Sequence, residues 1–410
     1  MYEVKKKIRG DQRLKTYIKD MQDKPANLEN NLPIIFSYDN LDVEKLEYAI
    51  NKIVERHDNL KSTFSIEDDV LYQVIFKSYP IKVNVLKEPP AGDFSKPFDV
   101  SKGPCLCFSV YRNTVYADFN HLFVDGFSLG IFFHELNEIY KGNELKDNLP
   151  DIEQLVVPDE VYEKNSLFYK PFYPKNLKKT LVEPDFKDAN MSDAGPAETE
   201  FYSLPTEFMT DIKEASKANG VTPNNFTTVA YNLLLSMMTK NENLYIGSDV
   251  SARNRMNFRS IGLYTTGIVF TYFVDPKKTV KELLQEVYLY TKEILNHQNL
   301  KITEILSSNG LKYKEVTDVA FVYQNEMISN IKLNDEVCKI TPIAHGDTFF
   351  AFVLSFFARK DNSVIQLTYR NDYYKKETVL RFIDEYIKVL KIMINNSDLL
   401  ISDVFKLMNY

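Results

Sequence analysis

The chain has 410 residues, of which 44% are hydrophobic and 26% charged, a composition typical of globular proteins that bury a sizeable core. Its 50 Lys and Arg against 57 Asp and Glu give a net charge of −7, which argues against the basic face that nucleic-acid binding needs. No stretch approaches the ~18 apolar residues that a membrane span requires, so we expect no membrane span.

The cysteines and the N-terminus point to the same compartment. Three cysteines are too few for a disulfide framework, and two of them, Cys105 and Cys107, stand two positions apart in one strand-like run. Neighbours on one face of a strand cannot bond comfortably to each other, and free buried thiols suit a reducing cytosol. The first residues contain no apolar signal core. The sequence therefore predicts a cytoplasmic protein.

Helix-like and strand-like patterns alternate through the first half of the chain. Apolar residues recur at helical spacing from Leu46 to Val54, behind the plausible N-cap Asp42. Further along, Gly126 opens a second helix that Gly142 ends. The elements predicted here are helix 42–57, strands 70–77 and 81–86, two strands within 105–121, and the helix after Gly126.

The stretch 146–198 differs, because prolines are scattered through polar residues with little periodicity. We interpret it as a connector between two lobes. Both halves mix strands and helices, which predicts an α/β protein with mixed sheets, made of lobe 1–165, connector 166–198 and lobe 199–410. The elements predicted in the second half are helices over Phe208 to Ala215, Phe226 to Met237, 279–296 and 375–395, and strands near 243–250, 264–273, 317–323, 348–358 and 364–370.

One of the five histidines lies where chemistry is expected. His121 stands between a predicted strand and a predicted helix, in the run Asn120-His-Leu-Phe-Val-Asp-Gly-Phe-Ser128. A strand end aims its side chain at a cleft, and the free N–H groups of a helix start stabilise negative charge. A neutral imidazole there can take a proton from an attacking amine or hydroxyl, while Asp125 fixes the loop through an ion pair. Taken alone, the pattern is short, and a structural histidine is the more frequent outcome.

Other chemistry finds less support. Ser128 falls in the first turn of the helix, where capping or oxyanion contact suits it better than covalent catalysis. A metal site is not expected, because His121 and Asp125 have no third ligand nearby. No glycine-rich phosphate motif is present. We expect His57 to be structural at the end of its helix, and His134 to be solvated.

Seven short motifs follow one another along most of the chain. They are Asp11-Gln-Arg-Leu14, Asn31-Leu-Pro33, Arg56-His-Asp-Asn-Leu-Lys-Ser-Thr-Phe64, Asn120 to Ser128, Ile246-Gly-Ser-Asp-Val-Ser-Ala-Arg253, Ile261-Gly-Leu-Tyr-Thr-Thr266 and His297-Gln-Asn-Leu-Lys-Ile-Thr-Glu304. In this order they resemble the motifs of the condensation domains of nonribosomal peptide synthetases, which belong to the chloramphenicol-acetyltransferase-like superfamily. Their collinearity carries the resemblance more than any single motif does.

The resemblance implies two similar lobes in a V, with the active site between them. It places the general base, or the residue that positions the acceptor, on His121. It makes Asp125 a structural residue, with Arg253 as the expected partner across the lobes, and turns the N–H of Gly126 toward the developing oxyanion. No tightly bound cofactor is implied. The substrates are a phosphopantetheine thioester, on an acyl or peptidyl carrier protein or on coenzyme A, and a small-molecule amine.

The chain departs from the family pattern at several positions. Asn120 replaces the first histidine of the motif, Phe127 replaces a common tryptophan, and Tyr264 stands where the family has phenylalanine. Lys61 stands in place of an arginine, which keeps the charge but loses the bidentate fork. The proposed base is untouched, so a drifted substrate class is permitted. The residues expected to support the site are Asn120, Ser128, Arg253 and Lys61.

Three functions fit these observations. The first is a freestanding condensation-type acyltransferase that forms an amide by direct transfer, with the donor on a separate carrier protein or on coenzyme A, because the chain leaves no room for a carrier domain. The second is an O-acyltransferase that uses acyl-coenzyme A and an alcohol. The third is a catalytically silent carrier-docking module, which binds without turnover. An epimerase-like activity ranks lower.

Overall fold

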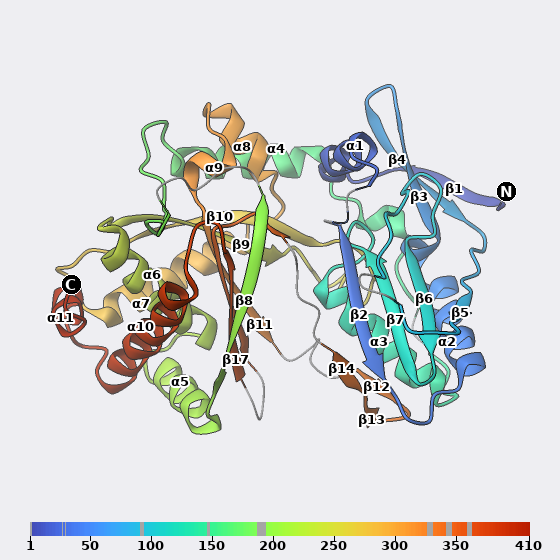
Figure 1. Ribbon diagram of the computed structural model, residues 1–410. Helices are drawn as coiled ribbons and strands as arrows, with labels where there is room; N and C mark the ends of the chain where they lie inside the picture. Colours follow the sequence, from blue (N-terminus) through green and yellow to red (C-terminus); the bar gives the residue numbers. More distant parts are fainter. Residues whose placement is uncertain are drawn as a thin grey trace. The chain divides into compact units, whose positions relative to one another are not determined.

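The computed structural model describes residues 2–26, 28, 30–90, 94–145, 148–186, 194–325, 331–341, 347–358 and 363–410. The chain divides into two compact units (Figure 1). Unit 1 consists of Met1–Val161, Arg253–Thr265 and Met327–Ile343, and unit 2 consists of Tyr162–Ala252, Thr266–Glu326 and Ala344–Tyr410.

Unit 1 is built on a five-stranded sheet with two helices packed on one face. The strand order is β14 (Lys339–Thr341), β2 (Asn31–Ser37), β7 (Thr114–Asn120), β6 (Leu106–Tyr111) and β5 (Val83–Val85). The helices are α2 (Val43–Arg56) and α3 (Gly126–Tyr140). Aromatic side chains pack between the helices and the sheet: the ring centroids of Phe132 in α3 and Phe119 in β7 lie 5.1 Å apart. A three-stranded sheet of β1 (Val4–Arg9), β4 (Val70–Phe76) and β3 (Ser62–Glu67), the short helices η1 (Gln12–Leu14) and η2 (Asp58–Lys61), and α1 (Lys15–Asp23) complete this part of the unit.

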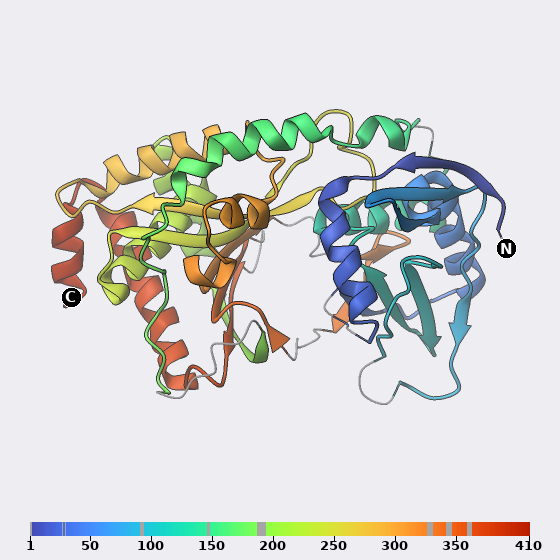
Figure 2. The same cartoon turned by 90° about the horizontal axis from the view of Figure 1, so that it is seen from above.

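Unit 2 is built on a seven-stranded mixed sheet. Its order is β10 (Thr265–Phe273), β9 (Asn243–Ser251), β11 (Val319–Asn325), β16 (Phe352–Ala358), β17 (Ser363–Arg370), β8 (Gly195–Leu204) and β15 (Asp347–Thr348). Helices α6 (Pro223–Thr239) and α10 (Lys376–Asn395) lie along one face of this sheet, with α5 (Thr206–Ala218) and α7 (Val280–Ile294) beside them (Figures 1 and 2). Every residue of α6 from Asn225 to Met237 is buried, as expected of a helix that is apolar on most of its surface.

The α/β fold class and most of the predicted elements are confirmed. Helix 42–57 is α2, capped by Asp42, and the strand pair in 105–121 is β6 and β7. The stretch 146–198, for which no element was predicted, contains helix α4 (Asp159–Tyr169), the short helices η3 (Ile152–Leu155) and η4 (Lys170–Phe172), and the start of β8. Helix α4 was missed because its buried residues are mainly tyrosines rather than an aliphatic stripe, and the strand because only Leu204, its last residue, is buried. Residues 187–193 of this stretch lie outside the described residues.

The compact units are not continuous in sequence, whereas the predicted lobes 1–165 and 199–410 are. Two segments from the second half of the chain belong to unit 1. One of them contributes β14, which pairs antiparallel with β2. The other, Arg253–Thr265, packs around the start of α3, as described below. Among the described residues, no helix is both long and apolar enough to cross a membrane.

Candidate active site

His121 lies on the loop that joins β7 to α3. The residues after it, 122–124, are apolar and buried, so the loop is anchored in the core of unit 1. Its backbone is also held by neighbours. The N–H of His121 donates to the carbonyl of Asn30 (2.7 Å), and the side chain of Asn59 donates to the carbonyl of Phe123 (2.7 Å).

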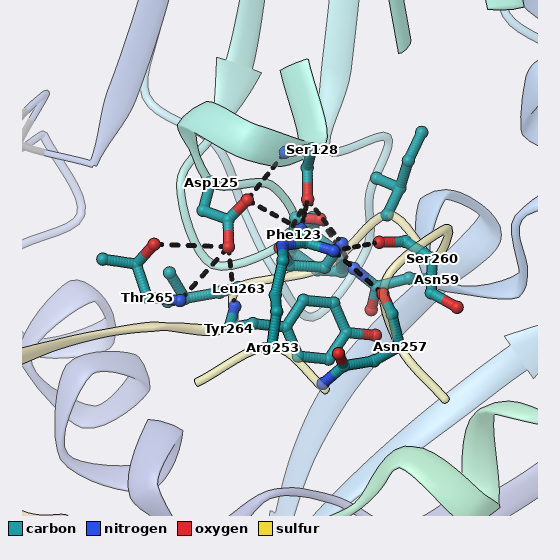
Figure 3. Close-up of polar contacts among 12 residues, drawn as sticks. Asn59, Phe123, Asp125, Ser128, Arg253, Asn257, Ser260, Leu263, Tyr264 and Thr265 are labelled. Carbon is teal, nitrogen blue, oxygen red and sulfur yellow. Dashed lines mark hydrogen bonds and ion pairs between the residues drawn. The ribbon is translucent and has the colours of Figure 1, made fainter. Parts of the chain in front are cut away.

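Asp125 caps α3 and is fully buried (Figure 3). Its Oδ1 accepts from the N–H of Ser128 (2.7 Å) and from Nη2 of Arg253 (2.9 Å). Its Oδ2 accepts from the N–H groups of Tyr264 (3.0 Å) and Thr265 (3.1 Å). Burial alone raises the pKa of this carboxyl, but the charge of Arg253 and these hydrogen bonds bring the pKa below its usual value. Asp125 is therefore an ionised structural residue with both oxygens occupied.

Arg253 supplies the expected ion pair, although it belongs to the same compact unit as Asp125. Its guanidinium lies over the rings of Phe127 (4.4 Å) and Tyr264 (4.5 Å), contacts that add cation–π attraction to the ion pair. Nη2 also donates to Oγ of Ser128 (2.7 Å), and Nη1 donates to the backbone carbonyls of Asn257 and Ser260 (2.9 Å each).

Residues 260–265, here called the strap, are bonded to the start of α3. The hydroxyl of Ser128 donates to the carbonyl of Gly262 (2.7 Å) and accepts its N–H (2.9 Å). Arg13 donates to two further strap carbonyls (2.6 and 3.0 Å). Because its oxygen already has three polar partners, Ser128 is a structural residue of the site; it holds the strap, while the cap of α3 is Asp125.

His121 and Gly126 are the two members of the motif that remain available for chemistry. The imidazole is half-buried, and its Nδ1 is buried without a hydrogen-bond partner among the described residues. Gly126 is the first residue of α3, and no described residue accepts from its N–H. An imidazole whose Nδ1 has no partner among the described residues and an unused helix N–H thus stand at the two ends of one loop.

Two further predicted residues act more indirectly. Asn120 is buried, and its Oδ1 accepts from the N–H of Leu122 (3.0 Å), which shapes the turn around His121. The ammonium of Lys61 bonds to Asp58 (3.0 Å) and to a backbone carbonyl at the end of α2. Any support that Lys61 gives to the site therefore runs through the corner between α2 and η2.

That corner contains residues that sequence reasoning missed or underrated. His57 is buried and bonded to Glu135 of α3 (2.9 Å), and its Nδ1 accepts from the N–H of Ile261 in the strap (3.3 Å). No pattern in the sequence pointed to Glu135.

Arg13 belongs to the first of the seven motifs, but its contacts with residues about 250 positions away could not be predicted from the residues around it. His134 is exposed, as predicted.

A cavity of about 890 Å³ lies in unit 1 on the His57 side of the strap. Its lining includes His57, Asn59, Ser260 and Tyr264, but neither His121 nor Gly126. The cavity is therefore not lined by the two residues of the motif that are proposed to act in catalysis. Among the described residues, no group of three or more His, Cys, Asp or Glu side chains is placed to hold a metal ion.

A two-unit α/β fold with a histidine and a buried, arginine-paired aspartate in a loop before a helix defines an acyltransferase-like architecture. Comparison with known families specifies it further: the family model of the condensation domain matches residues 22–409. The chain therefore belongs to the condensation-domain family, of the kind found in nonribosomal peptide synthetases.

Relatives and solved structures agree with this assignment. The chain is 24% identical over 402 residues to surfactin synthase subunit 2 of Bacillus subtilis (strain 168), covering 92% of this chain and 11% of the relative. It is 24% identical over 399 residues to tyrocidine synthase 2 of Brevibacillus parabrevis, covering 91% and 11%. The chain thus spans about a tenth of the length of these relatives.

Among solved structures, the condensation domain from the monacolin K polyketide synthase MokA matches with a TM-score of 0.78 at 17% identity, covering 97% of this chain and 100% of that one. The X-domain from teicoplanin biosynthesis matches with a TM-score of 0.78 at 16% identity, covering 96% of both chains. At these identities the likeness shows the fold.

Proposed function

We propose that this domain transfers an acyl group from a phosphopantetheine thioester to an amine. The amine nitrogen attacks the thioester carbonyl carbon, the carbon–sulfur bond breaks, and the thiolate leaves. His121 takes the proton from the nitrogen and returns it to the leaving sulfur. The observation that carries the proposal is the partly exposed imidazole of His121, with no hydrogen-bond partner at Nδ1 among the described residues, on a loop held by the Asp125 network.

Gly126 and Asp125 complete the proposed chemistry in different ways. The unused N–H of Gly126 is suited to the negative oxygen of the tetrahedral intermediate. Asp125 takes no part in proton transfer, because all its lone pairs face donors. Its role is to hold the loop in one geometry, which converts an encounter of two substrates into a positioned reaction.

The thioester donor can be carried by a carrier protein or by coenzyme A. One neighbour in fold, the starter condensation domain of the rhizomide synthetase RzmA, is described in complex with C8-CoA and Leu-SNAC. Both a loaded carrier protein and acyl-coenzyme A are therefore worth offering, with alcohols beside amines to detect ester formation.

The test is intact-product mass spectrometry with a panel of acyl-carrier proteins and acyl-coenzyme A, and a mixed amine and alcohol pool. We expect an amide from the wild type and a loss of rate of about 10²- to 10⁴-fold in His121→Ala. His134→Ala, which removes an exposed histidine of α3, is the matched control and should retain full rate. An amide formed equally fast by His121→Ala would remove His121 from the role of base.

A silent interaction module is the second candidate. The X-domain of teicoplanin biosynthesis shares the fold and is described in complex with OxyB, and this chain has Asn120 in place of the first motif histidine. This candidate predicts carrier binding that His121→Ala leaves unchanged, with no product from any donor.

A further inference from the structure

A second buried carboxylate is connected to the strap through His57. Glu135 of α3 has a side chain that is 7% exposed. Its Oε1 accepts from Nε of Arg56 (3.0 Å), and its Oε2 lies 2.9 Å from Nε2 of His57. Arg56 is the last residue of α2 and His57 is its C-cap, so Glu135 joins the end of α2 to α3.

The contacts of His57 determine where its ring proton lies. The N–H of Ile261 points at Nδ1 (3.3 Å), so Nδ1 must offer a lone pair. Nε2 then carries the proton and donates it to Glu135. An imidazolium, or the opposite tautomer, would set a ring N–H against the N–H of Ile261. Burial raises the pKa of Glu135, but the hydrogen bonds from His57 and Arg56 and the charge of Arg56 bring it below its usual value, which keeps the carboxylate ionised as an acceptor.

We propose that Glu135 and His57 are positioning residues for acyl transfer. Glu135 holds His57 in the Nε2–H tautomer, and Nδ1 of His57 holds the N–H of Ile261. The next residue of the strap, Gly262, is the one bonded to Ser128. The link to rate rests on the function proposed above, whereas the hold on the strap is a property of the free protein.

The consequence for the site follows from the order of contacts. If the strap loosens at Ile261, Asp125 loses well-placed donors from the N–H groups of Tyr264 and Thr265. The loop that carries His121 then loses its fixed end. A displacement of about 1 Å at a reacting group costs on the order of a hundredfold in rate. The expected effect is on kcat rather than on KM, because no substrate is proposed to contact Glu135.

Four variants separate this role from general packing. Glu135→Leu removes both acceptors, and Glu135→Gln restores one for the Nε2–H of His57. Glu138→Leu on the same helix is the matched control, since Glu138 pairs with Lys141 (2.7 Å) away from the strap. His57→Gln keeps a donor near Glu135 but loses the acceptor for Ile261.

A fifth variant, His57→Asn, places an oxygen near the position of Nδ1. We expect it to retain more of the strap contact than His57→Gln does. This pair keeps the inference testable if Glu135→Leu fails to fold.

Two readouts need no substrate. Nitrogen-15 NMR of histidine-labelled protein reports the tautomer of His57, which we expect to be Nε2–H in the wild type. Hydrogen exchange of peptides covering 260–265 reports the hold on the strap. We expect exchange about tenfold faster in Glu135→Leu and His57→Gln, the equivalent of one lost hydrogen bond, near wild type in Glu135→Gln, and unchanged in Glu138→Leu.

The third readout is the rate of acyl transfer. We expect kcat to fall about 10- to 100-fold in Glu135→Leu and His57→Gln with KM changed less than about twofold, and Glu135→Gln to recover most of the loss. An imidazolium or Nδ1–H state of His57, or wild-type exchange and kcat in the folded variants, would overturn the inference. If the wild type transfers no acyl group, the proposed function fails, while tautomer and exchange still decide the hold on the strap.

Discussion

Single residues in this domain divide into those that hold the loop and those left available for chemistry. Asp125 has two oxygens that face five donors from Ser128, Arg253, Tyr264 and Thr265. A buried carboxylate with so many partners is expensive to disturb, because removing its charge leaves the buried guanidinium uncompensated. His121 differs, because its buried Nδ1 forms no hydrogen bond with any described residue.

Asp125→Asn is expected to lower the free energy of unfolding by about 3 kcal/mol or more, because the side chain of Arg253 is only 4% exposed and keeps its charge. Urea titration followed by circular dichroism measures this change. Asp159→Asn is the control: it breaks the exposed pair with Arg9 (2.6 Å) and should cost less than about 1 kcal/mol. Equal losses in the two variants would contradict the structural role of Asp125.

At the scale of elements, the strap and the start of α3 form one bonded assembly. The strap has no regular secondary structure over most of its length, yet the side chains of Arg13, Asp125, Ser128 and His57 all bond to its backbone. Gly262 is bonded to Ser128 of α3, and a Cβ at Gly262 would stand 2.8 Å from the ring of Tyr264 in the same strap. The absence of a side chain at Gly262 is therefore needed for packing.

Gly262→Ala is expected to destabilise the domain by about 1–3 kcal/mol, since the ring of Tyr264 must move off the guanidinium of Arg253. Acyl transfer should fall with it. Gly267→Ala in β10 is the matched control, as the nearest atom to its Cβ is 3.9 Å away. It should change stability by less than about 1 kcal/mol. The urea midpoints and the acyl-transfer rates of both variants test this prediction. A Gly262→Ala protein as stable as the wild type would contradict the expected clash between a Cβ at position 262 and the ring of Tyr264.

At the scale of the whole molecule, unit 1 is assembled from three separated segments of chain. Its buried core includes Ile261 from the second segment and Ile331, Leu333 and Cys338 from the third. The sheet, the core and the Asp125 network therefore all require residues that follow position 252.

A fragment of residues 1–165, the predicted first lobe, is expected to show no cooperative unfolding transition, because it lacks Arg253, the strap and β14. Circular dichroism melts and limited proteolysis test this. Co-expression with residues 166–410 should restore protection of the fragment by supplying the missing segments. A cooperative melt of the fragment alone would show that the first 165 residues are sufficient.

Local patterns predicted the elements well wherever a stripe or an alternation is strong. The N-cap Asp42, the apolar stripe of α2 and the turn between β6 and β7 are all present as expected. Prediction failed where burial depends on distant partners. Helix α4 buries tyrosines, and β8 has only one buried residue, Leu204. Neither pattern is distinctive until the neighbouring elements are in place.

The sequence by itself determined the order of elements, the loop with His121, Asp125 and Gly126, and the resemblance to condensation domains, because these depend on residues adjacent in the chain. The tertiary structure decided which distant residues serve that loop. Arg13, Glu135 and the strap lie far apart in sequence, and only their hydrogen bonds reveal that they act together. The physical reason is that a buried charge must find its partners in space, wherever the chain supplies them.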